Sequence, residues 1–287
     1  MTGSIFQKKV RNSDLILKGL IYLAAFSAIM LLVGIMGYVF FRGIPQISWT
    51  FLSTVQSAKK GTFGILGNIV NTLYIIVITL LIAAPVGIGS AIYLNEYAKP
   101  GPLVRAIEFT TEMLSGIPSI IFGLFGMVFF GATCKLGYSV LTGSFTLTLM
   151  VLPLITRNTQ EALKTVPDSY RSGALGIGAT KWYMIRTILL PSAAPGILTG
   201  VILSIGRIVG ESAALLFTAG SGFQLPRNLF GKLFESSGTL TIQLYLCMQK
   251  AKYDQAFGIA VVLLIIVLGI NFLTRYLTQR FDVTRLK

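Results

Sequence analysis

The sequence contains no histidine, and this absence excludes several kinds of chemistry. A Ser-His-Asp triad and an HExxH zinc site both require histidine. The chain also lacks the phosphate-binding pattern GxxxxGK followed by Ser or Thr, so it should not hydrolyse ATP by itself. No run of carboxylates resembles a paired-acid active site. An enzyme is therefore not predicted, and this includes a membrane enzyme that acts on a lipid phosphate.

Charged residues are also scarce. They make up 12% of the 287 residues, whereas soluble domains carry about 25%. Hydrophobic residues make up 54%, the mean hydropathy is +0.76, and the apolar runs are continuous rather than alternating. This pattern favours spanning helices over a membrane β-barrel. The sequence therefore predicts an all-α polytopic membrane protein, and we attribute its net charge of +14 to membrane orientation rather than to nucleic acid binding.

Cysteine is limited to Cys134 and Cys247. Neither lies in a CxxC pattern or beside other metal-binding residues, so no metal site is predicted. We expect two unpaired thiols, and a disulfide between two outward loops is the alternative.

Six segments are apolar enough to cross a bilayer, which takes about 20 residues. They cover residues 19–41, 67–94, 113–131, 136–155, 191–220 and 256–273. The first follows a basic start and lacks a small-residue cleavage site, so we expect it to remain as an anchor. With the N-terminus in the cytoplasm, fifteen Lys and Arg fall on cytoplasmic segments, eight fall on outward loops, and one lies inside the fifth span. This bias predicts that both termini are cytoplasmic.

The spans divide the chain into three parts. We expect an N-terminal anchor helix and outward loop over residues 1–66, a transmembrane core over 67–278 and a cytoplasmic tail over 279–287. The outward loop at 221–255 contains TLTIQLYLCM, which either dips into the membrane or packs on the outer mouth; an ordinary amphipathic surface segment is the alternative. The longest cytoplasmic connection, 157–190, has helical character but is too polar to span.

Proline and glycine mark bends and close contacts within the spans. Pro85 and Pro118 each remove a backbone hydrogen bond and should bend their helices. Glycines recur four residues apart at 196 and 200 and at 206 and 210, and small residues at this spacing let helices approach closely in lipid.

Residues 170–191 read YRSGALGIGATKWYMIRTILLP and resemble the cytoplasmic loop of ABC importer permeases. That family's pattern is EAA, three residues, Gly, nine residues, then Ile, any residue, Leu and Pro. The matching positions are Ala174, Gly178, Ile188, Leu190 and Pro191. Ser172 and Gly173 replace the leading Glu-Ala, which puts a salt bridge from that glutamate in doubt. We predict an ATPase-docking segment whose packing face includes Ala174, Leu175, Ile177 and Trp182, and a helix resting on lipid headgroups is the alternative.

Four further stretches narrow the resemblance. They are residues 71–97, SGIPSIIFGLFG at 115–126, PLITRNTQEAL at 153–163 and RIVGESAAL at 207–215. Together they resemble the phosphate-specific ABC permeases, and the A-type subunit more than the C-type.

The resemblance implies a type I ABC importer permease fold with six transmembrane helices in a bacterial cytoplasmic membrane. It also implies three partners: a second homologous permease subunit, a cytoplasmic ATPase dimer and an extracytoplasmic phosphate-binding protein. No cofactor is expected in this chain, because ATP and Mg²⁺ would be bound by the ATPase.

Arginine and glutamate recur at a spacing of four residues in the predicted spans. Arg207 lies inside the fifth span, where arginine costs about 3 kcal/mol on insertion, and Glu211 should share its helix face. Arg157 and Glu161 repeat the spacing at the end of the fourth span. The resemblance implies that both arginines belong to the phosphate pathway and that Glu211 holds Arg207 in position. A guanidinium group fits this role because its donors match phosphate oxygens.

Each of these assignments has a structural alternative. An Arg-Glu pair can lock helices together without meeting substrate, and an arginine near a helix end can extend to the membrane surface. Ser115 and Ser119, on either side of Pro118, could contact an oxyanion, or their hydroxyls could bond back to the backbone. The remaining alternatives for the whole chain are a permease for another oxyanion, such as sulfate or molybdate, and a secondary transporter without an ATPase.

Overall fold

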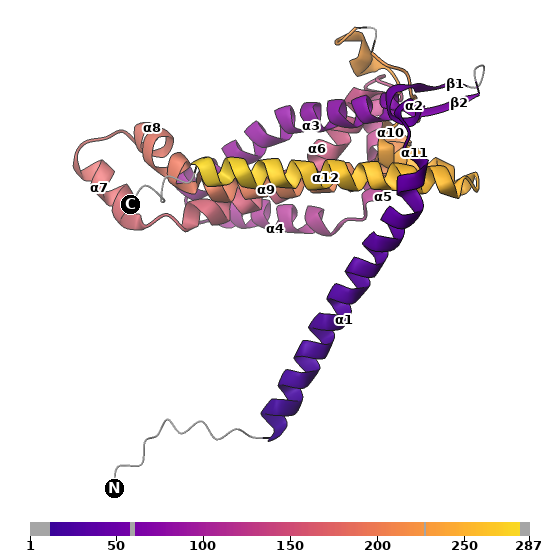
Figure 1. Ribbon diagram of the computed structural model, residues 1–287. Helices are drawn as coiled ribbons and strands as arrows, with labels where there is room; N and C mark the ends of the chain where they lie inside the picture. The colour runs from indigo at the N-terminus through magenta and orange to yellow at the C-terminus, as the bar shows by residue number, and fades with distance from the viewer. Residues whose placement is uncertain (1–11, 58–60, 227, 282–287) are drawn as a thin grey trace.

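The structure is a computed structural model that describes residues 12–57, 61–226 and 228–281. Four long helices lie along one another as a bundle (Figure 1). They are α3 (Leu66–Ile92), α6 (Val140–Lys164), α9 (Leu190–Gly210) and α12 (Tyr253–Phe281). At one end of the bundle lie α7 (Asp168–Gly176) and α8 (Lys181–Met184). At the other lie α2 (Trp49–Ser53) and the hairpin of β1 (Val55–Ser57) and β2 (Thr62–Ile65). We call these the α7–α8 end and the hairpin end.

The first helix, α1 (Asn12–Gly43), projects diagonally away from the bundle (Figure 1). Only its last turns touch other elements. Tyr38 meets the ring of Phe257 edge-on at 5.6 Å, and Gly43 lies so close to the Phe257 backbone that no side chain would fit there. The apolar remainder of α1 has no protein covering it within this chain.

Within the described residues, five helical stretches are long and apolar enough to span a membrane. They cover Leu15–Gln46, Leu66–Tyr97, Val140–Lys164, Lys181–Gly210 and Tyr253–Tyr276. A sixth span results if α4 (Pro102–Gly116) and α5 (Ser119–Gly126), the latter continuing as a π-helix over Met127–Thr133, are counted as one broken helix. The bend between the two is 103° at Pro118, where the sequence predicts a bend. Pro85 lies inside α3 without interrupting it.

Three predicted spans have different limits in the structure. The fourth continues past residue 155 to Lys164. The third begins at Pro102, not at residue 113, because α4 is a polar-faced helix that hydropathy does not detect. The fifth does not run to residue 220. It ends at Gly210, and α10 (Ala213–Thr218) follows after Glu211 and Ser212, which are not helical.

The α6–α9 contact confirms one of the two predicted glycine pairs. A Cβ on Gly196 would lie 2.6 Å from the Cβ of Ala162, and a Cβ on Gly200 would lie 2.6 Å from the Cβ of Asn158. Only glycine permits helices to pack so closely. A Cβ on Gly206 or Gly210 would have no such neighbour within 4 Å, so these glycines are not needed for packing within this chain.

The segment between α10 and α11 (Leu240–Gln249) covers the hairpin end, and we call it the closing segment. Asn68 and Asn71 on α3 donate to the carbonyls of Gly238 and Gly222, at 2.9 and 3.0 Å. Lys232 is 1% exposed and donates to the Gln224 carbonyl at 2.8 Å. The asparagine bonds fix Gly222 and Gly238 onto the first turns of α3, and the Lys232 bond holds the segment together.

The stretch TLTIQLYLCM forms α11, which packs on α12 and buries Leu240, Ile242 and Cys247. It is neither a loose surface segment nor a span. Cys247 is buried, Cys134 is exposed, and both thiols are free, as expected.

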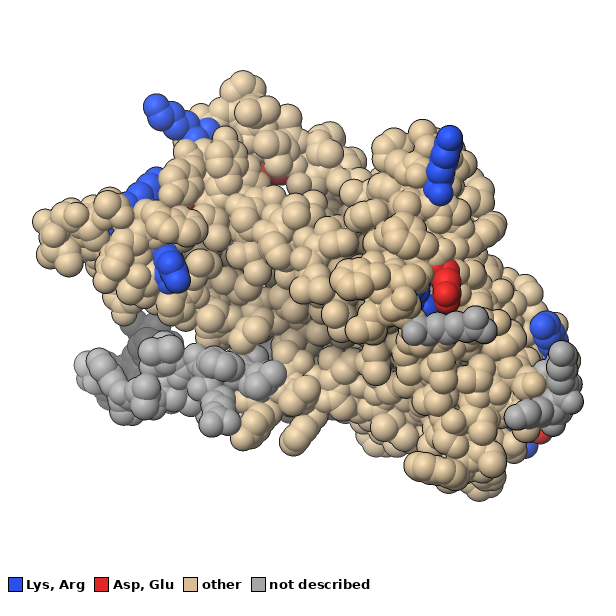
Figure 2. Space-filling view, turned by 90° about the horizontal axis from the view of Figure 1, so that it is seen from above, with Lys and Arg blue, Asp and Glu red and all other residues tan. Residues whose placement is uncertain are grey.

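Figure 2 views one long face of the bundle and shows it largely uncharged, with Lys and Arg gathered toward its two ends. Such a distribution is typical of a helical membrane protein, whose charged groups lie at the two interfaces.

Candidate functional site

A cavity of about 260 Å³ lies between α4, α6 and α9. Its polar lining comes from α4 with Glu108, Thr111, Glu112 and Ser115, from α6 with Arg157, Asn158 and Gln160, and from α9 with Arg207. Leu94, Met150, Pro153 and Leu154 complete it with apolar surface. The arrangement combines a few charged groups with a mainly apolar wall, as small-molecule sites do.

Arg157 and Arg207 reach this cavity at different depths. Because Gly196 packs on Ala162 and Gly200 on Asn158, the antiparallel register places Arg207 level with Val151. Six residues of α6 separate Val151 from Arg157, so the arginines are about 9 Å apart along the bundle axis. Arg157 lies toward the α7–α8 end and Arg207 toward the hairpin end.

The predicted pairing of Arg207 with Glu211 is wrong. The spacing of four residues aligns side chains only on a continuous helix, and α9 ends at Gly210. The Glu211 carboxylate instead accepts a hydrogen bond from the backbone N–H of Ala214 at 3.0 Å, near the start of α10. The Glu211 carbonyl accepts from the hydroxyl of Thr241 at 2.9 Å. Glu211 thus connects α10 and α11 and does not line the cavity.

The second pair forms as the spacing predicts. Arg157 Nε donates to Glu161 Oε1 at 3.0 Å, and both side chains are largely exposed in this chain. Because α6 continues to Lys164, Arg157 sits within the helix and not at its end. Glu161 is not among the residues that line the cavity.

The two predicted serines are separated by the bend at Pro118. Ser115 lines the cavity, and its hydroxyl donates to the Glu112 carbonyl at 2.7 Å, so its oxygen is placed by its own helix. Ser119 is the first residue of α5 and does not line the cavity. Serine therefore contributes one group to the site and not two.

Sequence analysis missed the acidic wall of the cavity. Glu108, Thr111, Glu112 and Ser115 follow the spacing i, i+3, i+4 and i+7, which places them on one helix face. Ser115 was predicted as a site residue, but Glu108, Thr111 and Glu112 lie before the predicted third span and were assigned to a connection.

The predicted docking segment forms two short helices joined by a turn. Gly178 has φ of +83°, and a Cβ there would have open space around it, so backbone conformation is what requires glycine at this turn. Thr180 caps α8 by accepting from the Tyr183 N–H. The exposed apolar side chains are Tyr170, Leu175, Ile177, Trp182 and Tyr183. Ile177 is 87% exposed, an exposure expected of a side chain that inserts into a partner.

Ala174 does not belong to that exposed face. It is buried in a cluster of its own chain that includes Leu163, Val166 and Met184. Ile188, Leu190 and Pro191 lie where the segment enters α9, and they connect the docking segment to the span.

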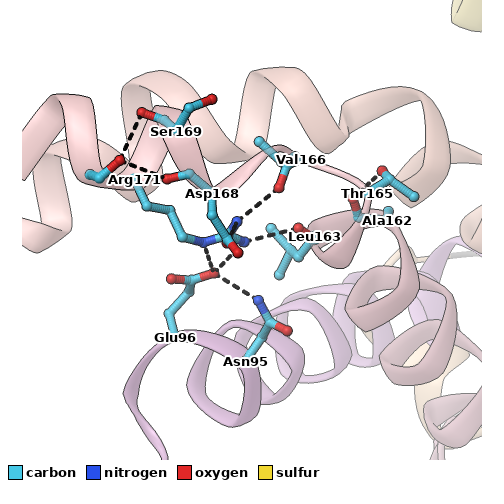
Figure 3. Close-up of polar contacts among 10 residues, drawn as sticks. Asn95, Glu96, Ala162, Leu163, Thr165, Val166, Asp168, Ser169 and Arg171 are labelled. Carbon is cyan, nitrogen blue, oxygen red and sulfur yellow. Dashed lines mark hydrogen bonds and ion pairs between the residues drawn. The ribbon is translucent and has the colours of Figure 1, made fainter.

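A buried ion pair attaches the docking segment to the π-helical turn Tyr93–Tyr97, which continues α3 as its last turn (Figure 3). Arg171 donates from Nη2 to Glu96 Oε1 at 2.9 Å and from Nε to the same oxygen at 3.2 Å. It also donates to the carbonyls of Leu163 and Val166, each at 2.9 Å. The side chains of Glu96 and Arg171 are 5% and 19% exposed. The side chain of Arg171 is therefore held within this chain by a carboxylate and two backbone carbonyls.

Lys181 adds a second attachment at the same place. Its ammonium group donates to the Glu96 carbonyl and lies 4.9 Å from the centre of the Tyr97 ring. The last turn of α3 is therefore fixed to both α7 and α8.

The chain is similar to known transport proteins over most of its length. The family described as "Binding-protein-dependent transport system inner membrane component" matches residues 83–283. The chain is 35% identical over 280 residues to the "Probable ABC transporter permease protein YqgI" of Bacillus subtilis, covering 92% of this chain and 95% of the relative. It is 32% identical over 248 residues to the "Phosphate transport system permease protein PstA" of Mycobacterium leprae, covering 85% and 81%.

Among solved structures, one chain of a bacterial alginate ABC transporter in complex with an alginate pentasaccharide-bound periplasmic protein superimposes with a TM-score of 0.69. The sequences are 17% identical, and the match covers 94% of this chain and 96% of that one. This similarity confirms the predicted all-α type I importer permease fold.

Proposed function

Because this chain belongs to the family of binding-protein-dependent transport system inner membrane components, we propose that it translocates inorganic phosphate as a permease subunit of an ATP-driven importer. Proteins of this family are permeases and not enzymes, and the ATPase is a separate subunit. The observation that carries the phosphate assignment is the cavity that contains Arg157, Arg207 and Ser115. The similarity to PstA proteins supports it.

The two arginines would act in sequence. Phosphate entering from the hairpin end meets Arg207 first and then Arg157, about 9 Å further along. A guanidinium group binds phosphate oxygens through paired donors and stays charged at all working pH values. Glu161, bonded to Arg157 at 3.0 Å, competes with the anion for that guanidinium and so favours release toward the α7–α8 end.

The partners follow from the exposed surfaces of this chain. The apolar side chains of α7 and α8 form the docking surface for a cytoplasmic ATPase dimer, which holds the ATP and Mg²⁺. A second, homologous permease subunit covers the uncharged faces and completes the pathway. An extracytoplasmic phosphate-binding protein delivers phosphate at the hairpin end. ATP binding draws the docking segments together and opens the pathway outward, and hydrolysis resets it.

This assignment sets the orientation. The docking segment and the C-terminal end of α12 lie at the same end of the bundle (Figure 1), which would be cytoplasmic. The Lys and Arg distribution supports a cytoplasmic N-terminus as well. The protein would thus be a multi-pass protein of the bacterial cytoplasmic membrane, with A-type character among phosphate permeases.

Two alternatives have distinct outcomes. A permease for sulfate or molybdate would use the same arginines but would carry those anions in preference to phosphate. A secondary transporter would need no ATPase, so it would purify without one and would continue transport when ATP is depleted.

The test is phosphate uptake in cells that depend on this transporter, with excess sulfate present. Arg207→Gln and Arg157→Gln should each lower uptake by at least tenfold at matched membrane expression, because each removes a charge-assisted bond to the anion. Arg105→Gln is the control, since Arg105 lies on α4 but does not line the cavity. Normal uptake by both cavity variants would refute the proposed pathway. Absence of phosphate uptake by the wild type would refute the substrate.

A further inference from the structure

The acidic face of α4 gives the cavity a second kind of polar group. Glu108 and Glu112 line it together with Arg157 and Arg207, so the formal charges of the lining residues sum to zero. A site that used charge alone to hold a doubly negative anion would have a surplus of positive charge. This cavity instead presents donors on α6 and α9 and acceptors on α4.

The carboxylates of Glu108 and Glu112 have no hydrogen bond or ion pair within the described part of the chain. Both carboxylates share the lining of the cavity with Arg157. By contrast, the hydroxyls of Thr111 and Ser115 already donate to backbone carbonyls of α4, at 2.8 and 2.7 Å. An ionised carboxylate can only accept hydrogen bonds. The α4 wall of the cavity therefore offers free hydrogen-bond acceptors but no free donor.

From this arrangement we infer that Glu108 and Glu112 select an oxyanion that still carries a proton. The inference rests on the proposed transport of phosphate and deepens it. At neutral pH phosphate and arsenate retain at least one O–H, which can donate to a carboxylate while the other oxygens accept from the arginines. Sulfate and molybdate retain no proton, so every oxygen that they turn toward α4 meets a like charge.

The expected selectivity follows from one charge-assisted hydrogen bond gained by phosphate and lost by sulfate. Such a bond changes affinity by about tenfold to 100-fold. A polar site that is left unpaired by the wrong ligand is also the strongest means of rejecting that ligand. Size cannot supply this discrimination, because the two tetrahedral anions are nearly the same size.

The experiment measures binding of radiolabelled phosphate and sulfate to the detergent-purified transporter complex without its binding protein, so that the binding protein's own selectivity does not contribute. The wild type should prefer phosphate. In Glu108→Gln, Glu112→Gln and the double variant, the preference over sulfate should fall, by at least tenfold in the double variant, because an amide can donate to sulfate. The preference for phosphate over arsenate should not change.

The control is Asp254→Asn, which removes one negative charge from an exposed position on α12 outside the cavity. It should leave the phosphate-to-sulfate ratio unchanged. A ratio that is unchanged in the double variant would overturn the role of the two glutamates while leaving phosphate transport intact. If the wild-type complex binds no phosphate, the proposed function itself fails.

Assembly is controlled separately. Should the glutamine variants not assemble with their partners, Glu108→Asp and Glu112→Asp replace them, since each keeps its charge and withdraws the acceptor by one methylene group. The double aspartate variant should show a smaller loss of preference for phosphate, and an unchanged ratio would again overturn the proposal.

Discussion

Replacing Glu96 by glutamine should loosen the docking segment without unfolding it. The change removes the charge of a carboxylate that is 5% exposed and bonded to Arg171 at 2.9 and 3.2 Å. Breaking a fully buried ion pair costs about 3–5 kcal/mol. Here the amide keeps one acceptor oxygen, and Arg171 keeps its bonds to the Leu163 and Val166 carbonyls. We therefore expect a smaller cost of about 2 kcal/mol.

The appropriate assay is hydrogen exchange of the α7 amides in the assembled transporter, because it reports local opening. A loss of about 2 kcal/mol corresponds to roughly 30-fold faster exchange, since 1.4 kcal/mol is a factor of ten. Exchange in the middle of α6 and α9 should remain at the wild-type rate. Phosphate transported per ATP hydrolysed should also fall, because the ATPase would move a segment that is less firmly attached to α3.

Asp168→Asn is the matched control, because Asp168 pairs with the same arginine at 3.1 Å but its side chain is 99% exposed. Exposed pairs contribute little to stability, so any acceleration should be slight and confined to the first turn of α7. The reasoning would be refuted if the two variants accelerated exchange equally, or if Glu96→Gln had no effect on it.

Three other predictions concern packing, turn geometry and thiol access. Gly200→Leu should destabilise the protein by about 1–3 kcal/mol through overpacking, whereas Gly206→Leu should be tolerated within this chain. The midpoint of thermal unfolding in detergent should therefore be lower for Gly200→Leu than for Gly206→Leu. Gly178→Ala should cost about 1–2 kcal/mol because its φ is +83°, and faster hydrogen exchange of α8 would reveal it; wild-type exchange would mean that the turn relaxes. A small maleimide should label Cys134 in the native protein and should label Cys247 far more slowly, because burial covers the Cys247 thiol and raises its pKa. Raising the pH should speed the labelling of Cys247. Equal labelling rates for the two cysteines would contradict this prediction.

Sequence alone predicted the elements whose evidence is local. Apolar length identified the long helices, and the spacing from Gly178 to Pro191 indicated the permease family to which the chain belongs. Gly178 has a left-handed backbone conformation, which is a property of a single position.

Sequence failed where tertiary contacts decide the outcome. The apolar composition around Arg207 suggested one long span, but α9 ends at Gly210, and composition does not reveal that Glu211 caps the next helix. Ala174 matched its motif, yet whether it faces a partner or its own core depends on α6. Glu96 and Arg171 are 75 residues apart, and no spacing rule connects them.

The helix α3 and its π-helical last turn have a mechanical consequence. Together they run uninterrupted from Leu66 to Tyr97, which makes a strut of about 48 Å. One end is bonded to the closing segment through Asn68 and Asn71, and the other is held by Arg171 and Lys181. A hydrogen-bonded helix resists compression along its axis. We therefore expect that a displacement of this helix at the α7–α8 end moves the segment bonded to it at the hairpin end by a similar amount. Spin labels at the two ends of this helix should then move together during turnover. Movement of one end alone would show that the helix bends or is compressed.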